Sequence, residues 1–282
     1  MFTSILTCVR NASEAHLRQC AASVLAQDCP LEWIIVEDGS DSRCSLVLGE
    51  LVSLFRQHLK VQYVRLARHS GLSVARNTAL ERASGDWIFV LDADDRIGAD
   101  ALRSVSRLAS AGARIVFFDT LWFSATFAGV RSKAKFYDLT VKNHKTIHDP
   151  LLWFDFFYQG LVARRDVIRQ VGGYDARFRV GEDIDILLRV LDNLDVRELR
   201  YSPTLGYEYR SNPCGVSNTS WDTVRKNYET SLLAAALRRG GDFHRCAYEG
   251  TLIVDRVEVD AYCFLDRFGR RHPYPHSGGA AL

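Results

Sequence analysis

Long uninterrupted apolar runs are missing from this chain of 282 residues. The longest apolar stretches, such as "IVFFDTLWF" and "LLWFDFFYQGLVA", are short or interrupted by Asp, so neither predicts a membrane span. The first residues, "MFTSILTCVRNASE", lack the basic start and the long apolar region of a signal peptide. We therefore expect no transmembrane segment, and a peripheral membrane contact is left open.

The seven cysteines lack the spacing of a disulfide framework or a zinc site. Their number is odd, they are scattered along the chain, and none belongs to a CxxC pair. This usage predicts reduced thiols and a cytoplasmic protein. The formal net charge is only +2, so the chain has no broad attraction for nucleic acid and any basic site must be local.

Apolar strand-like runs alternate with helix-like segments over the first 120 residues. We predict strands at 3–9, 31–38, 61–66, 87–92 and 113–119, and helices at 11–27, 44–59, 72–83 and 99–110. Asn11 and Glu14 resemble a capping box at the start of the first helix. The alternation predicts an α/β fold with a mainly parallel, Rossmann-like sheet flanked by helices.

The pattern loosens after residue 120. We predict strands at 121–127 and 132–139, a short helix at 149–158, a strand, short helix and turn across 160–175, and helices at 181–194 and 220–239. The last residues, 269–282, have little to bury, which predicts a disordered tail.

The stretch "VLDADD" (90–95) places three carboxylates at the end of a predicted buried strand. A polar loop with a helix-capping Asp explains one of them. A calcium EF-hand loop counted from Asp92 would need Gly and Glu where Ile97 and Arg103 stand, which excludes it. A phosphatase of the haloacid dehalogenase type would use Asp92 as nucleophile, but expects Thr or Val at Arg96.

The fourth interpretation of "VLDADD" is a D-x-D motif that holds a divalent cation on a nucleotide diphosphate. Hard oxygen ligands suit Mg²⁺ or Mn²⁺. Crowded carboxylates repel one another and disfavour their own ionisation. A bound cation would relieve that repulsion, although a D-x-D alone is a common sequence.

Four stretches in order resemble the inverting family-2 glycosyltransferases of GT-A fold: "SILTCVRN", "IIVEDGSDS", "HSGLSVARNTALERASGDWIFVLDADD" and "VGGYDARFRVGEDIDILLRV". The resemblance spans residues 3–211. It implies a GT-A domain over 1–211, with a nucleotide-sugar-binding half (1–119) and an acceptor and catalytic-base half (120–211). A C-terminal helical extension (212–268) would follow.

The resemblance also implies an activity. It is the inverting, Mn²⁺- or Mg²⁺-dependent transfer of a sugar from a nucleotide-diphospho-sugar to an acceptor hydroxyl by single displacement. The donor would be a UDP- or dTDP-sugar, and the acceptor a glycan, a lipid-linked molecule or a small natural product. Two alternatives remain open: a non-catalytic nucleotide-sugar-binding subunit, and the D-x-D phosphatase.

Roles on the donor side carry over to individual positions. Asp38 matches the carboxylate that reads the nucleobase, and Arg76 an arginine that faces the nucleotide. Asp92 would lie near the ribose and donor sugar, and Asp94 would be the metal ligand, with Asp92 and Asp95 as further metal candidates. The other expected nucleotide-sugar contacts are Cys8, Val9, Arg10, Asn11, Gly71, Ala93 and Arg210.

The stretch "GED" is the second expected chemical site. An acceptor hydroxyl is a weak nucleophile and needs a general base as it attacks. Asp183 matches the family's base, and Glu182 would orient it or bind the acceptor. Both acids could instead simply complement the start of a helix, and the residues alone leave that open.

The chain departs from the family's common pattern at four places. Arg10 stands where many relatives carry an aromatic that stacks on the base, and a guanidinium plane could stack instead. Glu37 replaces the commoner first Asp of its pair, and His69 a common Asn. Asn212 or Pro213 falls near an expected His, which leaves Tyr209, Arg210 and Ser217 as the candidates for diphosphate contact.

Overall fold

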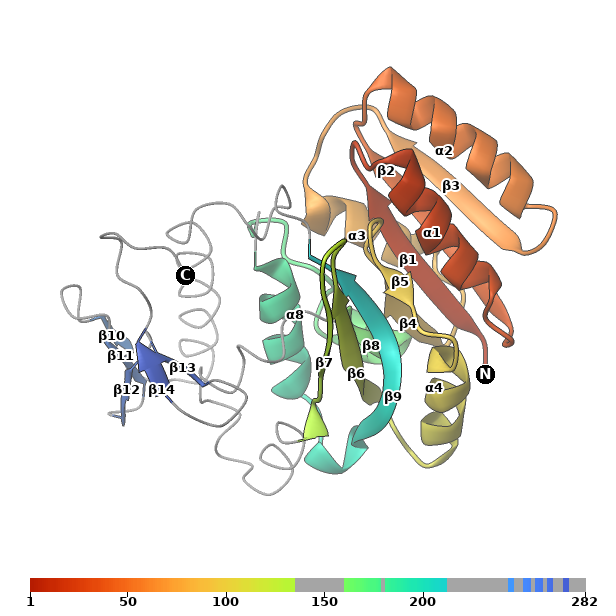
Figure 1. The fold of residues 1–282 in the computed structure, drawn as a ribbon. Coiled ribbons are helices and arrows are strands. Elements are labelled where there is room, and N and C mark those ends of the chain that lie inside the picture. Colours follow the sequence, from red (N-terminus) through yellow and green to blue (C-terminus); the bar gives the residue numbers. More distant parts are fainter. Residues whose placement is uncertain are drawn as a thin grey trace.

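The computed structural model describes residues 1–134, 160–178 and 181–211, together with the backbone of five short strands beyond residue 242. Alternating strands and helices form the first part (Figure 1). They are β1 (Thr3–Val9), α1 (Glu14–Leu25), β2 (Leu31–Asp38), α2 (Ser42–Phe55), β3 (Lys60–Leu66), α3 (Leu72–Arg82), β4 (Trp87–Val90), β5 (Arg96–Ile97) and α4 (Ala101–Ser110). The second part contains β6 (Ile115–Phe123), β7 (Ala128–Arg131), β8 (Val162–Arg164), α7 (Arg165–Gln170), α8 (Glu182–Leu191) and β9 (Leu199–Arg210).

One mixed sheet organises these elements in the order β3-β2-β1-β4-β8-β6-β9-β5, with β7 paired to β6. Strands β3, β2, β1 and β4 run parallel to their neighbours, as βαβ units require. Strand β8 is antiparallel to both β4 and β6. The predicted α/β class with a mainly parallel sheet is confirmed, and the antiparallel strands lie in its second half.

Helices cover both faces of the sheet because successive strand residues point to opposite sides. Ile5, Trp33 and Phe89 pack in one apolar cluster with residues of α1, α2 and α4. Their chain neighbours Leu6, Ile34 and Ile88 pack in a second cluster with residues of α3, α7 and α8. The apolar runs predicted as strands are therefore buried on both faces, as a covered parallel sheet demands.

The start of the first helix differs from our prediction. Ser13, not Asn11, is the N-cap of α1, and its hydroxyl accepts a hydrogen bond from the His16 N–H at 3.2 Å. Asn11 has a φ of 50°, in the left-handed region that Asn tolerates better than most residues. It therefore belongs to the turn that leaves β1 and not to the helix.

Three further elements were not predicted where they occur. Strand β5 and strand β9 pair antiparallel through Arg96–Glu208 and Ile97–Tyr207, and β9 runs parallel to β6. Of the strands predicted at 121–127 and 132–139, residues 121–123 form the end of β6, which pairs antiparallel with β7 at 128–131. The predicted helices at 149–158 and 220–239 lie outside the described residues, as does Ser217.

Short strands, not helix, occupy the described parts of the predicted C-terminal helical extension. They are β10 (Phe243–Arg245), β11 (Thr251–Val254), β12 (Val257–Asp260), β13 (Cys263–Leu265) and β14 (Arg271–Pro273). The last of these stands within the predicted disordered tail and pairs with β13. No helix in the described part of the chain has the length and apolar character that a bilayer crossing requires.

Candidate active site

The carboxyl ends of β1 and β2 lie side by side, because the two strands pair in register from Thr3–Leu31 to Val9–Glu37. Asn11 ties the turn after β1 to the turn after β2. Its N–H donates to the Ser40 hydroxyl at 3.1 Å, and its side-chain oxygen accepts from the Asp41 N–H at 2.8 Å. Asn11 therefore shapes the expected nucleotide-binding edge by holding two loops together.

Asp38 fastens the loop that leads into α3. Its carboxylate accepts from the N–H groups of Ser70 at 2.6 Å and Gly71 at 2.9 Å, and lies 2.8 Å from Nδ1 of His69. The next residue, Gly39, has a φ of +65°, and a Cβ there would lie 2.4 Å from the His69 nitrogen. Glycine is required at this close approach. Asp38 thus has a structural task beside the expected base contact.

Arg76 joins the two acidic sites. Its Nη1 lies 2.6 Å from Oε1 of Glu182, and its Nη2 lies 3.0 Å from Oδ1 of Asp92. The guanidinium is buried, with its carbon 5.4 Å from the centre of the Tyr174 ring. A planar guanidinium can pair with two carboxylates and stack on an aromatic face at once. Arg76 therefore connects the turn after β4 to the start of α8.

Two acids begin α8. Gly181 precedes them with a φ of +82°, and the side chain of Asp183 accepts from the Ile184 N–H at 2.8 Å. Glu182 is buried, and this burial raises its pKa to about 7, although Arg76 acts in the opposite direction. Asp183 is accessible to solvent, yet protein surrounds it on enough sides to raise its pKa above the ordinary value.

The acidic turn, which we define as Asp92–Asp95, closes with a hydrogen bond from the Asp95 N–H to the Asp92 carbonyl at 3.1 Å. Burial and the neighbouring Asp92 raise the pKa of Asp94 above its ordinary value. Arg210 donates from Nε to the Asp94 carbonyl at 2.7 Å and so lies against this turn. The arginine predicted for the diphosphate is thus beside the predicted metal ligand.

Asp95, predicted as a further metal candidate, is hydrogen-bonded to strand β9. Its two carboxyl oxygens accept from the Tyr207 hydroxyl at 2.8 Å and from the Arg210 N–H at 2.6 Å. Only 1% of the residue is exposed, and its pKa is raised well above the ordinary value by burial and by Asp92 and Asp94. Asp95 holds β9 against the acidic turn, and we do not retain it as a metal candidate.

Asp92 and Asp94 fit a divalent cation as a pair. Both are partly exposed, both offer hard oxygen atoms, and Asp92 is close enough to Asp94 to raise its pKa. Among the described residues, no three His, Cys, Asp or Glu side chains come together as a complete metal site. Mg²⁺ commonly takes only one or two protein carboxylates and completes its shell with phosphate oxygens and water.

The other residues predicted to contact the nucleotide-sugar differ in how deeply they are buried. Val9 and Ala93 pack in the core, so only their backbone could meet a ligand. Cys8 lies at the other face of the sheet, where the charges of Arg76 and Asp92 reach it, and burial raises the pKa of its thiol to about 12. Arg10 is exposed directly after β1. The Cys8 thiol is therefore no nucleophile here.

Three residues near the site were missed by the sequence argument. Tyr174 stacks under Arg76, and Tyr207 accepts from the Asp92 N–H at 3.2 Å as well as donating to Asp95. His16 lies within electrostatic reach of both Arg210 and Asp94, and its pKa is lowered mainly by burial and then by Arg210. Tyr174 stands inside the stretch "VGGYD", so the pattern contained a signal that we did not use.

Comparison with known proteins defines the family. The sequence profile described as Glycosyl transferase family 2 matches residues 4–172, more than half of the chain. The chain belongs to this family. The matched residues contain Asp38, Arg76 and the acidic turn, and they end just before the 173–183 stretch that carries the second acidic site.

Two curated relatives of this family-2 chain are longer than it is. It is 28% identical over 189 residues to the O-antigen biosynthesis protein RfbC of Myxococcus xanthus, a match that covers 66% of this chain and 14% of RfbC. It is 24% identical over 233 residues to the succinoglycan biosynthesis protein ExoO of Rhizobium meliloti, covering 80% of this chain and 64% of ExoO. The chain thus spans less than two thirds of either relative.

Solved structures confirm the fold. Residues 1–349 of S. aureus TarS in complex with UDP-GlcNAc superpose with a TM-score of 0.67 at 16% identity, covering 84% of this chain and 67% of that one. The mannosyltransferase PcManGT of Pyrobaculum calidifontis, in complex with GDP-Man and Mn²⁺, gives a TM-score of 0.61 at 17% identity, with coverages of 84% and 64%. At these identities the likeness establishes the GT-A-type fold alone.

Proposed function

We propose that this family-2 chain is an inverting, metal-dependent glycosyltransferase that moves a sugar from a nucleotide-diphospho-sugar to an acceptor hydroxyl by single displacement. The observation that carries the proposal is the bridge made by Arg76, which pairs with Asp92 at 3.0 Å and with Glu182 at 2.6 Å. Through these two ion pairs, one guanidinium holds Asp92 on the donor side close to the start of α8. A transferase needs its donor site and its base in such proximity.

On the donor side, Asp92 and Asp94 would hold Mg²⁺ or Mn²⁺. When bound, the cation neutralises charge that develops on the departing nucleoside diphosphate. Arg210 lies against the same turn through its bond to the Asp94 carbonyl at 2.7 Å and adds a positive charge beside it. Because Asp95 is engaged by β9, the turn keeps its shape before any ligand arrives.

At the second site, Asp183 takes the proton of the attacking hydroxyl. Asp183 is exposed to solvent, so an acceptor can reach it. Its raised pKa makes the carboxylate more basic, which suits a general base that acts near neutral pH. Glu182 is buried against Arg76, so we assign it the role of orienting neighbour. Attack from the base side with departure on the cation side inverts the anomeric carbon.

The donor and acceptor classes rest on likeness to relatives. The TarS complex contains UDP-GlcNAc, which supports a UDP-sugar, and a dTDP-sugar remains the second candidate. The PcManGT complex contains GDP-Man, so proteins of this fold bind donors with different nucleobases. The names of RfbC and ExoO refer to polysaccharide biosynthesis, which supports a glycan as the acceptor.

The decisive experiment is Asp183→Asn in the full chain. A thermal-shift screen of UDP-, dTDP- and GDP-sugars with Mn²⁺ first identifies the donor, because binding to the native state raises its stability. Release of nucleoside diphosphate then reports transfer to water or to added glycan. We expect Asp183→Asn to bind donor normally and to lose about 100- to 10,000-fold in turnover, the usual contribution of a general base.

Asp192→Asn is the matched control, since it makes the same change at the exposed far end of the same helix. Full turnover by Asp183→Asn would refute the assigned base. Donor binding by the unaltered protein without any release of nucleoside diphosphate would favour the non-catalytic nucleotide-sugar-binding subunit instead.

A further inference from the structure

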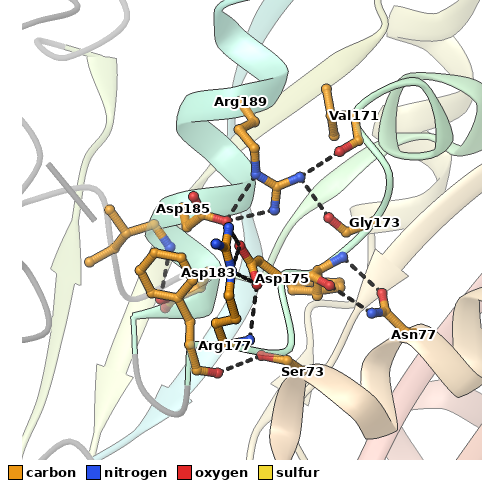
Figure 2. A network of polar contacts seen from close by, with 12 residues as sticks. Ser73, Asn77, Val171, Gly173, Asp175, Arg177, Asp183, Asp185 and Arg189 are labelled. Carbon is orange, nitrogen blue, oxygen red and sulfur yellow. Dashed lines mark hydrogen bonds and ion pairs between the residues drawn. The ribbon is translucent and has the colours of Figure 1, made fainter. Parts of the chain in front are cut away.

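The segment between α7 and α8 is clamped from two helices (Figure 2). We call residues 171–178 the 171–178 loop. Helix α3 contacts it through Ser73 and Asn77, and helix α8 contacts it through Arg189. Each of these contacts is made to the loop's backbone, so the clamp fixes the path of the chain whatever the loop's side chains are. None of the three residues belongs to the donor or base sites described above.

On the α3 side, Asn77 pairs with both backbone groups of Tyr174. Its amide nitrogen donates to the Tyr174 carbonyl at 2.7 Å, and its amide oxygen accepts from the Tyr174 N–H at 2.8 Å. Gly173 has a φ of +71°, which favours glycine, and a Cβ there would lie 2.7 Å from that amide oxygen. The Ser73 hydroxyl adds a bond to the Phe178 carbonyl at 2.8 Å.

On the α8 side, all three guanidinium nitrogens of Arg189 donate hydrogen bonds. Nη1 donates to the carbonyls of Val171 at 2.6 Å and Gly173 at 2.7 Å, while Nε and Nη2 donate to Asp185 at 2.9 and 2.6 Å. An exposed ion pair of this spacing would add only a few tenths of a kcal/mol. Here the Asp185 side chain is 1% exposed, so the pair orients a buried guanidinium toward the loop.

The clamped loop carries Tyr174 to the centre of the proposed site. The residue is 4% exposed, and its ring lies 5.4 Å from the guanidinium carbon of Arg76. That guanidinium in turn pairs with the carboxylates of Asp92 and Glu182. A shift of the loop would move the Tyr174 ring, against which the Arg76 guanidinium packs. Both ion pairs depend on the position of this guanidinium.

We propose that Asn77 and Arg189 are positioning residues that act, through the 171–178 loop, on the guanidinium that joins the two acidic sites. The proposal rests on the proposed function. It adds that hydrogen bonds to the backbone of the loop that carries Tyr174 set the relative placement of the donor-side acid and the base. A displacement of about 1 Å caused by a distant mutation can cost about 100-fold in rate.

The test compares Asn77→Ala and Arg189→Lys with Arg177→Lys. Arg177 is the matched control because it belongs to the same loop, but its side chain is 88% exposed and pairs with Asp175 of the loop itself (Figure 2). We expect the two clamp variants to lose about 10- to 100-fold in kcat for nucleoside diphosphate release. Donor KM should change little in all three variants, because none of the changed side chains belongs to the donor site and KM rises when ground-state binding is lost.

Hydrogen exchange supplies a readout that does not need activity. The first turn of α8 is reported by the Ile184 N–H, bonded to Asp183, and the Asp185 N–H, bonded to the Gly181 carbonyl at 3.1 Å. Asn77→Ala lies on α3, yet we expect it to speed exchange in this turn of α8 as well as in the loop. Arg177→Lys should not change hydrogen exchange in the loop or in the first turn of α8.

Faster exchange in the loop with unchanged exchange in α8 and unchanged kcat would overturn the proposal and leave the clamp as fold stabilisation only. A protein that turns over no donor would remove the proposed function, while the exchange coupling would still be measurable. Asn77→Ala and Arg189→Lys alter different helices, so a failure of one to fold leaves the other as the test.

Discussion

Substituting Glu182 by Gln should change how stability depends on pH. Burial raises the pKa of Glu182 from 4.5 to about 7, so the native protein holds a proton that the unfolded chain has released between these values. The stability linked to this proton is fully present below pH 4.5 and is lost as pH rises through about 7. A glutamine side chain cannot ionise, so Glu182→Gln should not suffer this loss.

The magnitude follows from the two pKa values. A shift from 4.5 to about 7, at about 1.4 kcal/mol for each unit, corresponds to between about 3 and 4 kcal/mol in total. Between pH 5 and pH 8, the interval in which the protein can be measured, about 2 to 3 kcal/mol of this stability is lost. The free energy of unfolding of wild type should therefore fall by about 2 to 3 kcal/mol more than that of Glu182→Gln over this interval.

Urea denaturation at pH 5, 6, 7 and 8, followed by the fluorescence of the five tryptophans, measures this difference. Comparing slopes, and not absolute stabilities, cancels the other buried acids that both proteins share. Glu50→Gln on α2 is the control, because Glu50 is exposed and a charge in water costs little in either state. Equal slopes for wild type and Glu182→Gln would show that the Arg76 pair fully compensates the buried carboxylate, and would refute the reasoning.

Two further predictions concern the acidic turn. Asp94→Ala should weaken the Mn²⁺-dependent binding of UDP by at least about tenfold in calorimetric titrations, since even indirect support of a metal is worth that much. Asp100→Ala, an exposed acid paired with Arg103, is its control, and unchanged Mn²⁺ dependence in Asp94→Ala would argue against the assigned ligand. Tyr207→Phe removes the hydroxyl that donates to buried Asp95 at 2.8 Å and should lower the free energy of unfolding by about 1–3 kcal/mol. Wild-type stability of Tyr207→Phe in urea would contradict the structural role given to Asp95.

Most of the first half of the fold is readable from the sequence because its signals are local. An apolar run such as 31–38 matches β2 residue for residue, and the predicted helix 72–83 differs from α3 by one residue. The capping of α1 was misplaced by two residues, because Asn11 and Ser13 are both good caps and only the backbone path of the turn chooses between them. Strand β5, with two residues, is too short to leave a periodic pattern.

The sequence by itself determined which acids stand at the ends of strands and at the start of a helix. Asp38 follows "IIVE", Asp92 follows "WIFVL", and Asp183 stands at the start of an amphipathic helix. These positions follow from periodicity and chain order, which are properties of neighbouring residues. The sequence could not separate the tasks of the three carboxylates in the acidic turn. Their partners come from segments far along the chain, and pairing over such separations leaves no periodic signal.

Only the tertiary structure shows which partners these carboxylates have. Strand β9, about a hundred residues after the acidic turn, brings Tyr207 and the Arg210 N–H to Asp95 and thereby removes it from the metal candidates. The Arg76–Glu182 pair likewise joins residues 106 positions apart. Burial then separates the two acids of "GED", because Glu182 faces the guanidinium while Asp183 faces solvent. A carboxylate's chemistry depends on its charge partners and its hydration, and the folded chain alone supplies both.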